Sequence, residues 1–387
     1  MNGAETALLL SLALPGLGAV GIALCASRPN LREGITLGAA LLLFLNVATL
    51  LSPVLAGARP SAVVLEWLPG LTLALKAEPL GMIFALVASL LWPINSLYSI
   101  GYVRANREEH QTRYYVCFAI ALMAAMGIAF AANLFTLFVF YELLTLSTYP
   151  LVTHKGTSEA VRAGRVYLGI LIGTSIGLLL PAILWTYVLA DNLDFMPGGL
   201  LAGKVQGPEL TLLLGLYMLG IGKAALMPLH RWLPAAMVAP TPVSALLHAV
   251  AVVKAGVFSI IKVLVYVFGE DLLRQTPASD WLLYLAGFTI IVASLIALRQ
   301  NNLKRRLAYS TISQLSYVIL GAAILAPLST LGAALHVAAH AFGKITLFFA
   351  AGSIYTAAHK TDISDLNGIG RRMPWTMGAF AVGTLSM

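Results

Sequence analysis

The sequence predicts an all-α, polytopic transmembrane helix bundle in which some of the helices are broken. The first observation is the composition: 59% of the 387 residues are hydrophobic and only 10% are charged, whereas about a quarter of the residues of a soluble domain are charged. The second is a succession of apolar runs, each about as long as the 20-residue helix that crosses a bilayer. The third is that Lys and Arg are concentrated in alternate loops between these runs.

Eleven apolar runs are long enough to form membrane-spanning helices. They cover residues 7–26, 34–55, 79–103, 114–131, 133–153, 166–190, 210–229, 241–268, 281–298, 307–328 and 330–357. The first run lacks the preceding basic residues of a signal peptide, so it is predicted to remain a membrane helix. A twelfth run begins at Pro374 and ends at Met387, which is too short to cross, and the bundle is therefore expected to be C-terminally incomplete.

The loops carry positive charge unevenly. Loops after odd-numbered runs hold 16 of the 24 Lys and Arg residues, and loops after even-numbered runs hold four. Cytoplasmic loops of membrane proteins retain the excess of Lys and Arg. The N-terminus is therefore predicted to lie outside, and the chain to be a multi-pass protein of the cell's inner (plasma) membrane.

The remaining four basic residues lie inside the runs, together with a single carboxylate. Glu142, Lys223, Lys254 and Lys344 fall near the middle of their runs, where a charge costs about 2.5–3.5 kcal/mol. Their matching depth predicts a polar layer that lines water. Structural ion pairs are the alternative, but one carboxylate cannot neutralise three lysines. Lys262 lies near the end of its run and is predicted to be an interfacial anchor.

Histidines add to this layer. His336, His340 and Lys344 recur at every fourth position, which places them in one stripe of a helix. Three titratable groups stacked in this way can form a proton wire with bridging water. His248 is read both as a proton carrier and as a hydrogen-bonded packing residue.

Two runs contain residues that break helices. Gly220 and Gly222 directly precede Lys223, and Pro240 and Pro242 open the run at 241–268. Non-helical backbone at membrane depth is tolerated where it lines a cavity, and discontinuous helices often mark ion sites. The neighbouring lysine favours this interpretation over an ordinary proline kink.

Several other kinds of site are excluded. The GxGxxG pattern at residues 16–21 lies in an apolar run without a preceding strand, so its glycines are predicted to pack helices together. Cys25 and Cys117 have no partners at metal-ligand spacing. The sequence contains no motif for a cofactor or a metal. The spread of Lys and Arg over many short loops argues against nucleic-acid binding.

Three segments together resemble the antiporter-like membrane subunits shared by respiratory complex I, Mrp-type multisubunit Na+/H+ antiporters and membrane-bound hydrogenases. The resemblance covers the chain from about residue 79 onward. The segments are Phe140 to Leu144 around Glu142, Lys223 to Ala236, and Ala239 to Gly256 with His248 and Lys254, and they are joined by the trio His336, His340 and Lys344.

The resemblance implies two inverted repeats, each forming a proton half-channel. The N-terminal three-helix segment would be 1–113, the first repeat 114–280, and the second, truncated repeat 281–387. Glu142 and Lys223 would be the coupling pair, in direct or water-bridged contact. Lys254 would connect the half-channels, with His248 on the way, and Lys344 would belong to the second.

The implied function is proton translocation within a multisubunit complex. The loop from Gly368 to Pro374 favours the D-type membrane component of a Mrp-type monovalent cation/proton antiporter. A proton-pumping subunit of complex I or of a membrane-bound hydrogenase is the first alternative, and a structural scaffold is the second. The expected partners are other membrane subunits, the lipid bilayer and protons, with Na+ or K+ left open, and no redox site is expected in this chain.

Overall fold

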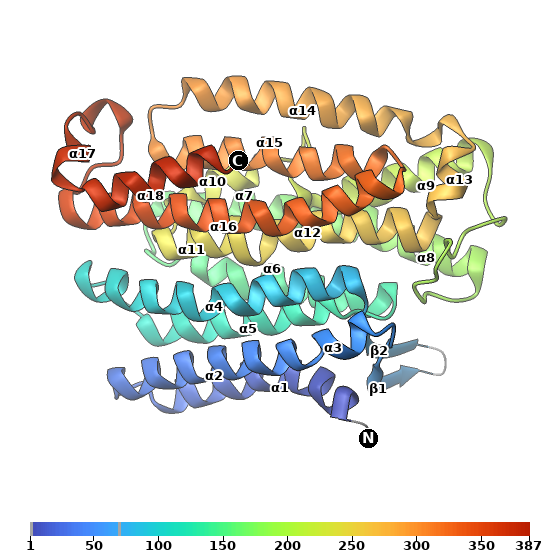
Figure 1. The fold of residues 1–387 in the computed structure, drawn as a ribbon, viewed down its shortest axis with the longest axis horizontal. Coiled ribbons are helices and arrows are strands. Elements are labelled where there is room, and N and C mark those ends of the chain that lie inside the picture. The colour runs from blue at the N-terminus through green and yellow to red at the C-terminus, as the bar shows by residue number, and fades with distance from the viewer. Residues whose placement is uncertain (1–2, 69–70) are drawn as a thin grey trace.

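Helices run along one common axis in a computed structural model that describes residues 3–68 and 71–387 (Figure 1). Nine helices of this described part are long and apolar enough to cross a membrane. The bundle is therefore a multi-pass membrane protein, as the composition predicts. Its centre is the segment from Thr241 to Phe268, the most deeply buried of the nine.

The first third of the chain forms five membrane-length helices and a short one. They are α1 (Gly3–Leu24), α2 (Pro29–Thr49), α3 (Leu51–Leu55), α4 (Pro79–Ala105), α5 (Gln111–Ala129) and α6 (Leu134–Val152). Asn133 caps α6 by accepting a hydrogen bond from the Thr136 amide at 2.7 Å. This cap explains the tight turn between α5 and α6, because it satisfies an amide that the helix leaves free.

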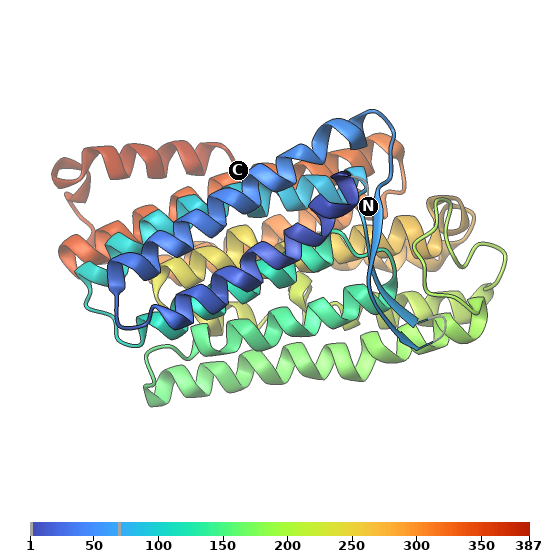
Figure 2. The ribbon, with the colours of Figure 1, turned by 90° about the horizontal axis from the view of Figure 1, so that it is seen from below.

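The middle of the chain contains the interrupted helices. They are α7 (Ser158–Thr174), which continues through the π-helical turn η1 (Ser175–Leu179) into α8 (Leu180–Ala190), then α9 (Gly207–Gly220), η2 (Gly222–Ala224), α10 (Trp232–Ala235), η3 (Ala236–Val238), α11 (Thr241–Ala245), the π-helical turn η4 (Leu246–Val250), α12 (Val252–Lys262) and η5 (Val263–Phe268). Helix α7–α8 lies along one edge of the bundle (Figure 2).

The remainder of the chain is again helical. It comprises α13 (Glu270–Arg274), η6 (Pro277–Ser279), α14 (Asp280–Arg299), α15 (Leu303–Ala323), α16 (Pro327–Ala358), η7 (Ile363–Asp365), α17 (Ile369–Arg372) and α18 (Pro374–Leu385). Helix α15 packs against both α14 and α16. Helix α18 starts at the predicted Pro374 and packs on α16.

Two of the predicted spans differ from expectation. The run at 210–229 does not form one helix, because α9 ends at Gly220 after 14 residues. The run at 307–328 forms α15, but it is not among the nine apolar helices, because Arg306 and the polar residues Ser310, Thr311, Ser313, Gln314 and Ser316 lower its hydropathy. Thr311, Ser313 and Ser316 are buried in the bundle.

A β-hairpin was not predicted from the sequence. Strands β1 (Ser61–Leu68) and β2 (Leu71–Lys76) pair antiparallel between α3 and α4. Strand β2 also bonds to the bundle, since the Lys76 amide donates to the Phe130 carbonyl at 2.7 Å and the Ala132 amide to the Ala74 carbonyl at 3.0 Å. Val63, Val64 and Trp67 were the missed signal, because β-branched and aromatic residues favour strands.

The two ends of the bundle differ in charge. One end, called the hairpin end, carries β1, β2, α13 and the loop 191–206 (Figure 1). The other, called the basic end, carries the turns 105–110, 153–157, 300–302 and 359–368. Arg107, Lys155 and Lys360 lie in these turns, and Arg104, Arg299, Lys304, Arg305 and Arg306 lie beside them. This arrangement agrees with the alternation of charge read from the sequence.

Glycines of the GxGxxG pattern contact neighbouring helices. A Cβ atom on Gly18 would lie 2.8 Å from the Ala39 Cβ of α2, and one on Gly16 would lie 3.2 Å from the Met123 sulfur of α5. Any larger residue would push these helices apart. The prediction that these glycines are close-packing residues is confirmed.

Candidate functional site

Lys223 lies where the helical backbone is interrupted. After α9 ends, Ile221 leaves the helical region with ψ 60°, and Ala225 has a left-handed φ of 55°. The Trp232 indole donates to the Gly222 carbonyl at 3.0 Å, which satisfies one acceptor freed by the break. The break thus turns the Lys223 side chain into the protein interior, and its exposure is 0%.

Neutral acceptors on α6 hold the Lys223 ammonium. Its Nζ atom donates to the Tyr141 carbonyl at 2.8 Å and to the Thr145 hydroxyl at 2.6 Å. It also lies 3.2 Å from the centre of the Tyr141 ring. In return, the Tyr141 hydroxyl accepts from the Lys223 amide at 3.0 Å. The Lys223 amine is therefore held here by neutral atoms, without a bonded carboxylate.

Glu142 has no bonded partner. Both carboxylate oxygens are buried, and neither accepts a hydrogen bond from the described part of the chain. The direct form of the predicted direct or water-bridged pair between Glu142 and Lys223 is therefore not present in the described structure. The reason is helical geometry: Lys223 contacts the face of α6 that carries Tyr141, and the next residue points about 100° away from it. A water-bridged contact is the remaining form of the pair.

Helix α12 packs closely on the break. A Cβ atom on Gly256 would lie 2.3 Å from the Ala224 amide nitrogen and 2.4 Å from the Lys223 carbonyl carbon. Only glycine allows this approach, because real Cβ contacts are essentially never so short. The sequence Lys254-Ala255-Gly256 thus places Lys254 on the same helix, one turn or less from the break.

His248 and Lys254 lie on the central helix. His248 belongs to the π-helical turn η4, its exposure is 0%, and both of its ring nitrogens lack partners among the described residues. Its ring lies 4.8 Å from that of Phe348. The Lys254 ammonium contacts Nδ1 of His340 on α16 in a short hydrogen bond. The central helix is thereby joined to the second half of the chain.

The stripe His336, His340 and Lys344 faces α12 and α15. His336 Nε2 lies 2.7 Å from the Gln314 Oε1 atom, and the rings of His336 and His340 stack 6.1 Å apart. The Lys344 ammonium donates to the Ser310 hydroxyl at 2.5 Å. Each of the three groups thus contacts a polar atom inside the bundle.

Lys262 is not an interfacial anchor, which corrects the sequence-based prediction. Its exposure is 1%, and its ammonium lies 3.3 Å from the Glu78 carboxylate and 2.8 Å from the Ala131 carbonyl. The Phe195 ring lies 4.4 Å away. Lys76 approaches the other Glu78 oxygen at 3.1 Å. The β-hairpin closes this end of the bundle and prevents Lys262 from reaching water.

Sequence reasoning missed the neutral partners of Lys223, Lys344 and His336. Thr145, Ser310 and Gln314 are polar residues inside apolar runs. Their positions were the signal that could have predicted hydrogen-bond partners for buried groups. Glu78 was missed because it directly precedes a run. In residues 3–68 and 71–387, no three His, Cys, Asp or Glu residues are placed to hold a metal ion.

Comparison with known proteins gives one family. Residues 131–387 match the family described as NADH:quinone oxidoreductase/Mrp antiporter, TM. NADH-quinone oxidoreductase subunit N of Desulforudis audaxviator (strain MP104C) is 32% identical over 360 residues, which cover 92% of this chain and 71% of that protein. Matches to several other curated relatives cover about half of their length or less.

Two solved structures are similar in fold. One is the membrane-bound sulfane sulfur reductase, an archaeal respiratory membrane complex, with a TM-score of 0.86 and 26% identity, covering 98% of this chain and 77% of the other. The second is the Mrp complex from Dietzia sp. DQ12-45-1b, with a TM-score of 0.81 and 21% identity, covering 92% and 65%. At that identity, the second shows the fold alone.

Proposed function

We propose, from the premise that this chain belongs to the NADH:quinone oxidoreductase/Mrp antiporter family, that it translocates protons as one subunit of a multisubunit membrane complex. The observation that carries the proposal is the pair of buried ionisable groups at the helix break. Lys223 is bonded only to neutral atoms, and Glu142 is bonded to none. Burying such groups without a charged partner costs free energy, and ionisable groups of this kind cluster at functional sites.

The arrangement suggests how a conformational step moves a proton. Lys223 is most easily protonated when the Glu142 carboxylate is near, because opposite charges about 4 Å apart attract by ~4 kcal/mol at an effective dielectric of about 20. When they separate, burial favours the neutral amine and the proton leaves. Lys254 lies on the helix that packs against the break, so it is placed to take the proton through water or His248.

The second part of the route begins at the contact between Lys254 and His340. A proton on Lys254 can pass to the His340 ring and then along the stripe to His336 or Lys344. We assign Glu142, Lys223, His248, Lys254, His336, His340 and Lys344 to this route. The segments 114–280 and 281–387 are the two proposed half-channel repeats, with the 1–113 segment beside them.

The energy source distinguishes two candidates. The first candidate is the D-type component of a Mrp-type antiporter, which the sequence from Gly368 to Pro374 supports. Na+ or K+ would be the exchanged ion. A redox-driven complex is favoured by the similarity of this chain, over 98% of its length, to a chain of a respiratory membrane complex. Copurification decides between them: flavin-, nickel- or iron–sulfur-containing subunits indicate the redox complex, and small membrane subunits alone indicate the antiporter.

The orientation follows from the charge of the two ends. We propose that the basic end faces the cytoplasm and the hairpin end faces outside, in the inner (plasma) membrane. Labelling of single cysteines from each side tests this orientation. Labelling of a cysteine at Arg305 from the outside would contradict it.

Lys223→Ala in the native complex tests the function. We expect the variant complex to assemble and its proton flux to fall to background, measured with a pH dye in everted membrane vesicles. Lys204→Ala is the control, because Lys204 is an exposed loop lysine, and its flux is expected to equal that of the unmodified complex. Normal flux in Lys223→Ala would instead identify the chain as a scaffold.

A further inference from the structure

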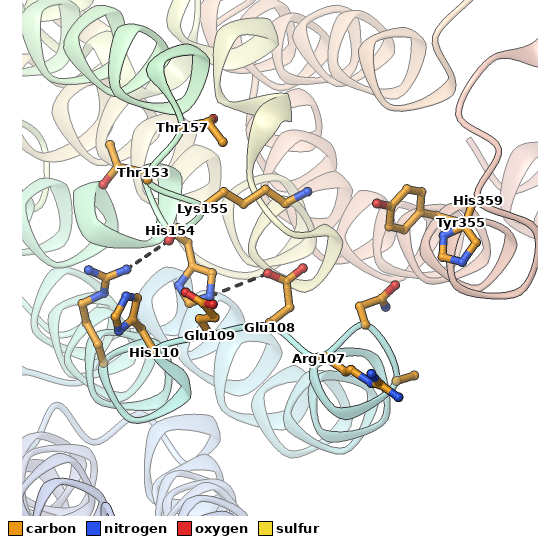
Figure 3. Close-up of a pocket in the computed structure, with 14 residues that line it drawn as sticks. Arg107, Glu108, Glu109, His110, Thr153, His154, Lys155, Thr157, Tyr355 and His359 are labelled. Atoms are coloured by element: carbon orange, nitrogen blue, oxygen red, sulfur yellow. Dashed lines mark hydrogen bonds and ion pairs between the residues drawn. The ribbon is translucent and has the colours of Figure 1, made fainter.

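A pocket of about 560 Å³ opens at the basic end between the turn 105–110, the turn after α6 and the end of α16 (Figure 3). Glu108 and His154 point toward each other across it, with 3.9 Å between Oε2 and Nε2. His154 is 4% exposed, and its Nδ1 atom lacks a partner among the described residues. A residue of the pocket wall thus has a buried ring nitrogen that no described residue satisfies.

A second cavity of about 250 Å³ adjoins this pocket. The two cavities share Lys155 and Tyr355 in their walls. The inner cavity reaches Thr241, the first residue of α11. Lys304, also in its wall, donates to the Ala239 carbonyl at 2.5 Å. Space therefore extends from the surface to the start of the broken helix that carries His248.

One face of α4 continues from Thr241 toward His248. Asn95, Tyr98 and Tyr102 are spaced i, i+3 and i+7, so they share a face of the helix. Helix α4 packs against both α11 and η4 along this region. The Asn95 amide donates to the Pro242 carbonyl at 3.3 Å, and the Tyr98 hydroxyl to the Phe349 carbonyl at 2.9 Å.

Several polar atoms along this face are buried without partners in the described structure. They are Asn95 Oδ1, Ser244 Oγ and both ring nitrogens of His248, and all three residues are 0% exposed. Buried polar groups in native proteins are almost always hydrogen-bonded, and water is the usual partner where the protein supplies none. Their succession indicates a file of water between α4 and the broken helix.

We propose that the pocket at Glu108 and His154, the cavity beside Lys304 and the Asn95 face of α4 form one proton inlet that leads from the basic end to His248. This inference rests on the proposed function, because it names the entrance of the same proton route. It assigns α4, which lies outside the two proposed repeats, to the wall of that entrance.

Each step of the inlet moves one proton and breaks no bond between heavy atoms. The Glu108 carboxylate takes a proton from hydronium at the surface and releases it to water inside the pocket. At the inner end, a free ring nitrogen of His248 accepts a proton from the water file and forms imidazolium. The imidazolium then gives a proton through water to the Lys223 amine, where the proposed route begins, and His248 is neutral again.

The surroundings of Glu108 suit this role. Burial raises the pKa of Glu108, against the opposing effect of the Lys155 and Lys304 charges, so its protonated form persists to higher pH. Burial, followed by the Arg113 charge, lowers the pKa of His154 to about 4, so His154 is a neutral hydrogen-bonding partner at pH 7. The charged and titratable groups around the pocket are Arg107, Glu109, His110, Arg113, His154, Lys155, Lys304, Tyr355 and His359.

Glu108→Gln tests the outer part of the inlet in the native complex. We expect proton flux to fall by about tenfold at alkaline pH on the basic side and to approach that of the unmodified complex at acidic pH, where hydronium is abundant. Glu66→Gln is the matched control, since Glu66 is an exposed glutamate on β1 at the hairpin end, and its flux should not change. Equal reduction at every pH would overturn the proton-collecting role of Glu108.

Ser244→Cys tests the inner part, in a complex whose Cys25 and Cys117 are replaced by Ala. Silver ions are small enough to follow a file of water, and we expect them to block flux when added at the basic end. Ser259→Cys is the control, because Ser259 is equally buried on α12, nearer the hairpin end. Flux that is insensitive to silver in Ser244→Cys would overturn the route, whatever Glu108→Gln shows.

The two proposals fail in different ways. Absence of proton flux from the unmodified complex, or normal flux in Lys223→Ala, contradicts the proposed function. A different set of results overturns the inlet alone. In that set, Lys223→Ala abolishes proton flux, Glu108→Gln keeps the full rate and pH profile, and silver has no effect on Ser244→Cys.

Discussion

Two buried lysines of this protein lie close to a carboxylate, and the two regions solve the problem of buried charge differently. At the hairpin end, Lys262 and Glu78 form an ion pair of 3.3 Å that Lys76 and the Ala131 carbonyl complete. At the helix break, Lys223 bonds to neutral atoms while Glu142 remains without a partner among the described residues. We call the first arrangement the closed pair, because its opposite charges are in contact, and the second the open pair, because they are not.

The difference separates a structural charge from a mobile one. A paired lysine whose acceptors are all in place gains nothing by releasing its proton. A lysine beside an unpaired carboxylate has protonated and neutral states of similar free energy. A small movement of either group can change which state is favoured. The closed pair also lies where β2 binds the bundle, whereas the open pair lies where the backbone of α9 is interrupted.

The largest expected effect on stability is at the closed pair. Glu78→Gln leaves the buried Lys262 ammonium without its counter-ion, so we expect a loss of about 3–5 kcal/mol in the free energy of unfolding. Adding Lys262→Met should recover most of the loss, because no buried charge then remains. Thermal unfolding in detergent measures both variants. A double variant no more stable than Glu78→Gln would mean that the two residues act independently.

A smaller effect is expected where α12 packs on the break. Gly256→Ala places a Cβ atom 2.3 Å from the Ala224 amide nitrogen, and overpacking of this kind costs about 1–3 kcal/mol. We also expect lower proton flux, because the position of Lys223 changes. Gly215→Ala is the control: its Cβ would meet nothing within 4 Å, and alanine in a helix stabilises by about 0.5–1 kcal/mol. Equal unfolding temperatures for the two variants would contradict close packing at Gly256.

The smallest effect is a pH dependence from His154. Because burial lowers its pKa to about 4 in the folded protein, from an ordinary value of about 6.5, the folded state disfavours the charged ring. Its stabilising contribution is complete above the ordinary pKa and decreases as pH falls toward the folded pKa, by about 1 kcal/mol after allowance for solvent. In His154→Gln, we expect the free energy of unfolding to depend less on pH over this acidic range. Unfolding at several pH values measures this. An unchanged pH profile would show that His154 titrates normally.

The sequence predicts the bundle better than it predicts the contacts within it. Hydrophobicity and charge placed most helices within a few residues, because membrane insertion depends on these two properties. The breaks beside Lys223 and His248 were also predictable from Gly and Pro. The β-hairpin was not predicted, because its strands lie in a segment that was assigned as a loop between two clearly apolar helices.

The partners of the ionisable residues were the harder part. The sequence separates Lys262 from Lys223 only by its place near the end of an apolar run, which wrongly predicted an interfacial anchor. Only the folded chain shows that β2 brings Glu78 to Lys262, and that the break turns Lys223 toward Tyr141 and away from Glu142. These contacts join residues far apart in the chain, so no local pattern encodes them.

Glu142→Gln tests the central claim most directly, because it changes the open pair without removing a protein hydrogen bond. Proton flux in everted vesicles and the unfolding temperature in detergent are measured on the same preparation. We expect flux to fall to background, unfolding to remain unchanged, and Glu142→Asp to retain part of the flux. Normal flux in Glu142→Gln, or a loss of stability like that of Glu78→Gln, would contradict the claim that the open pair carries protons.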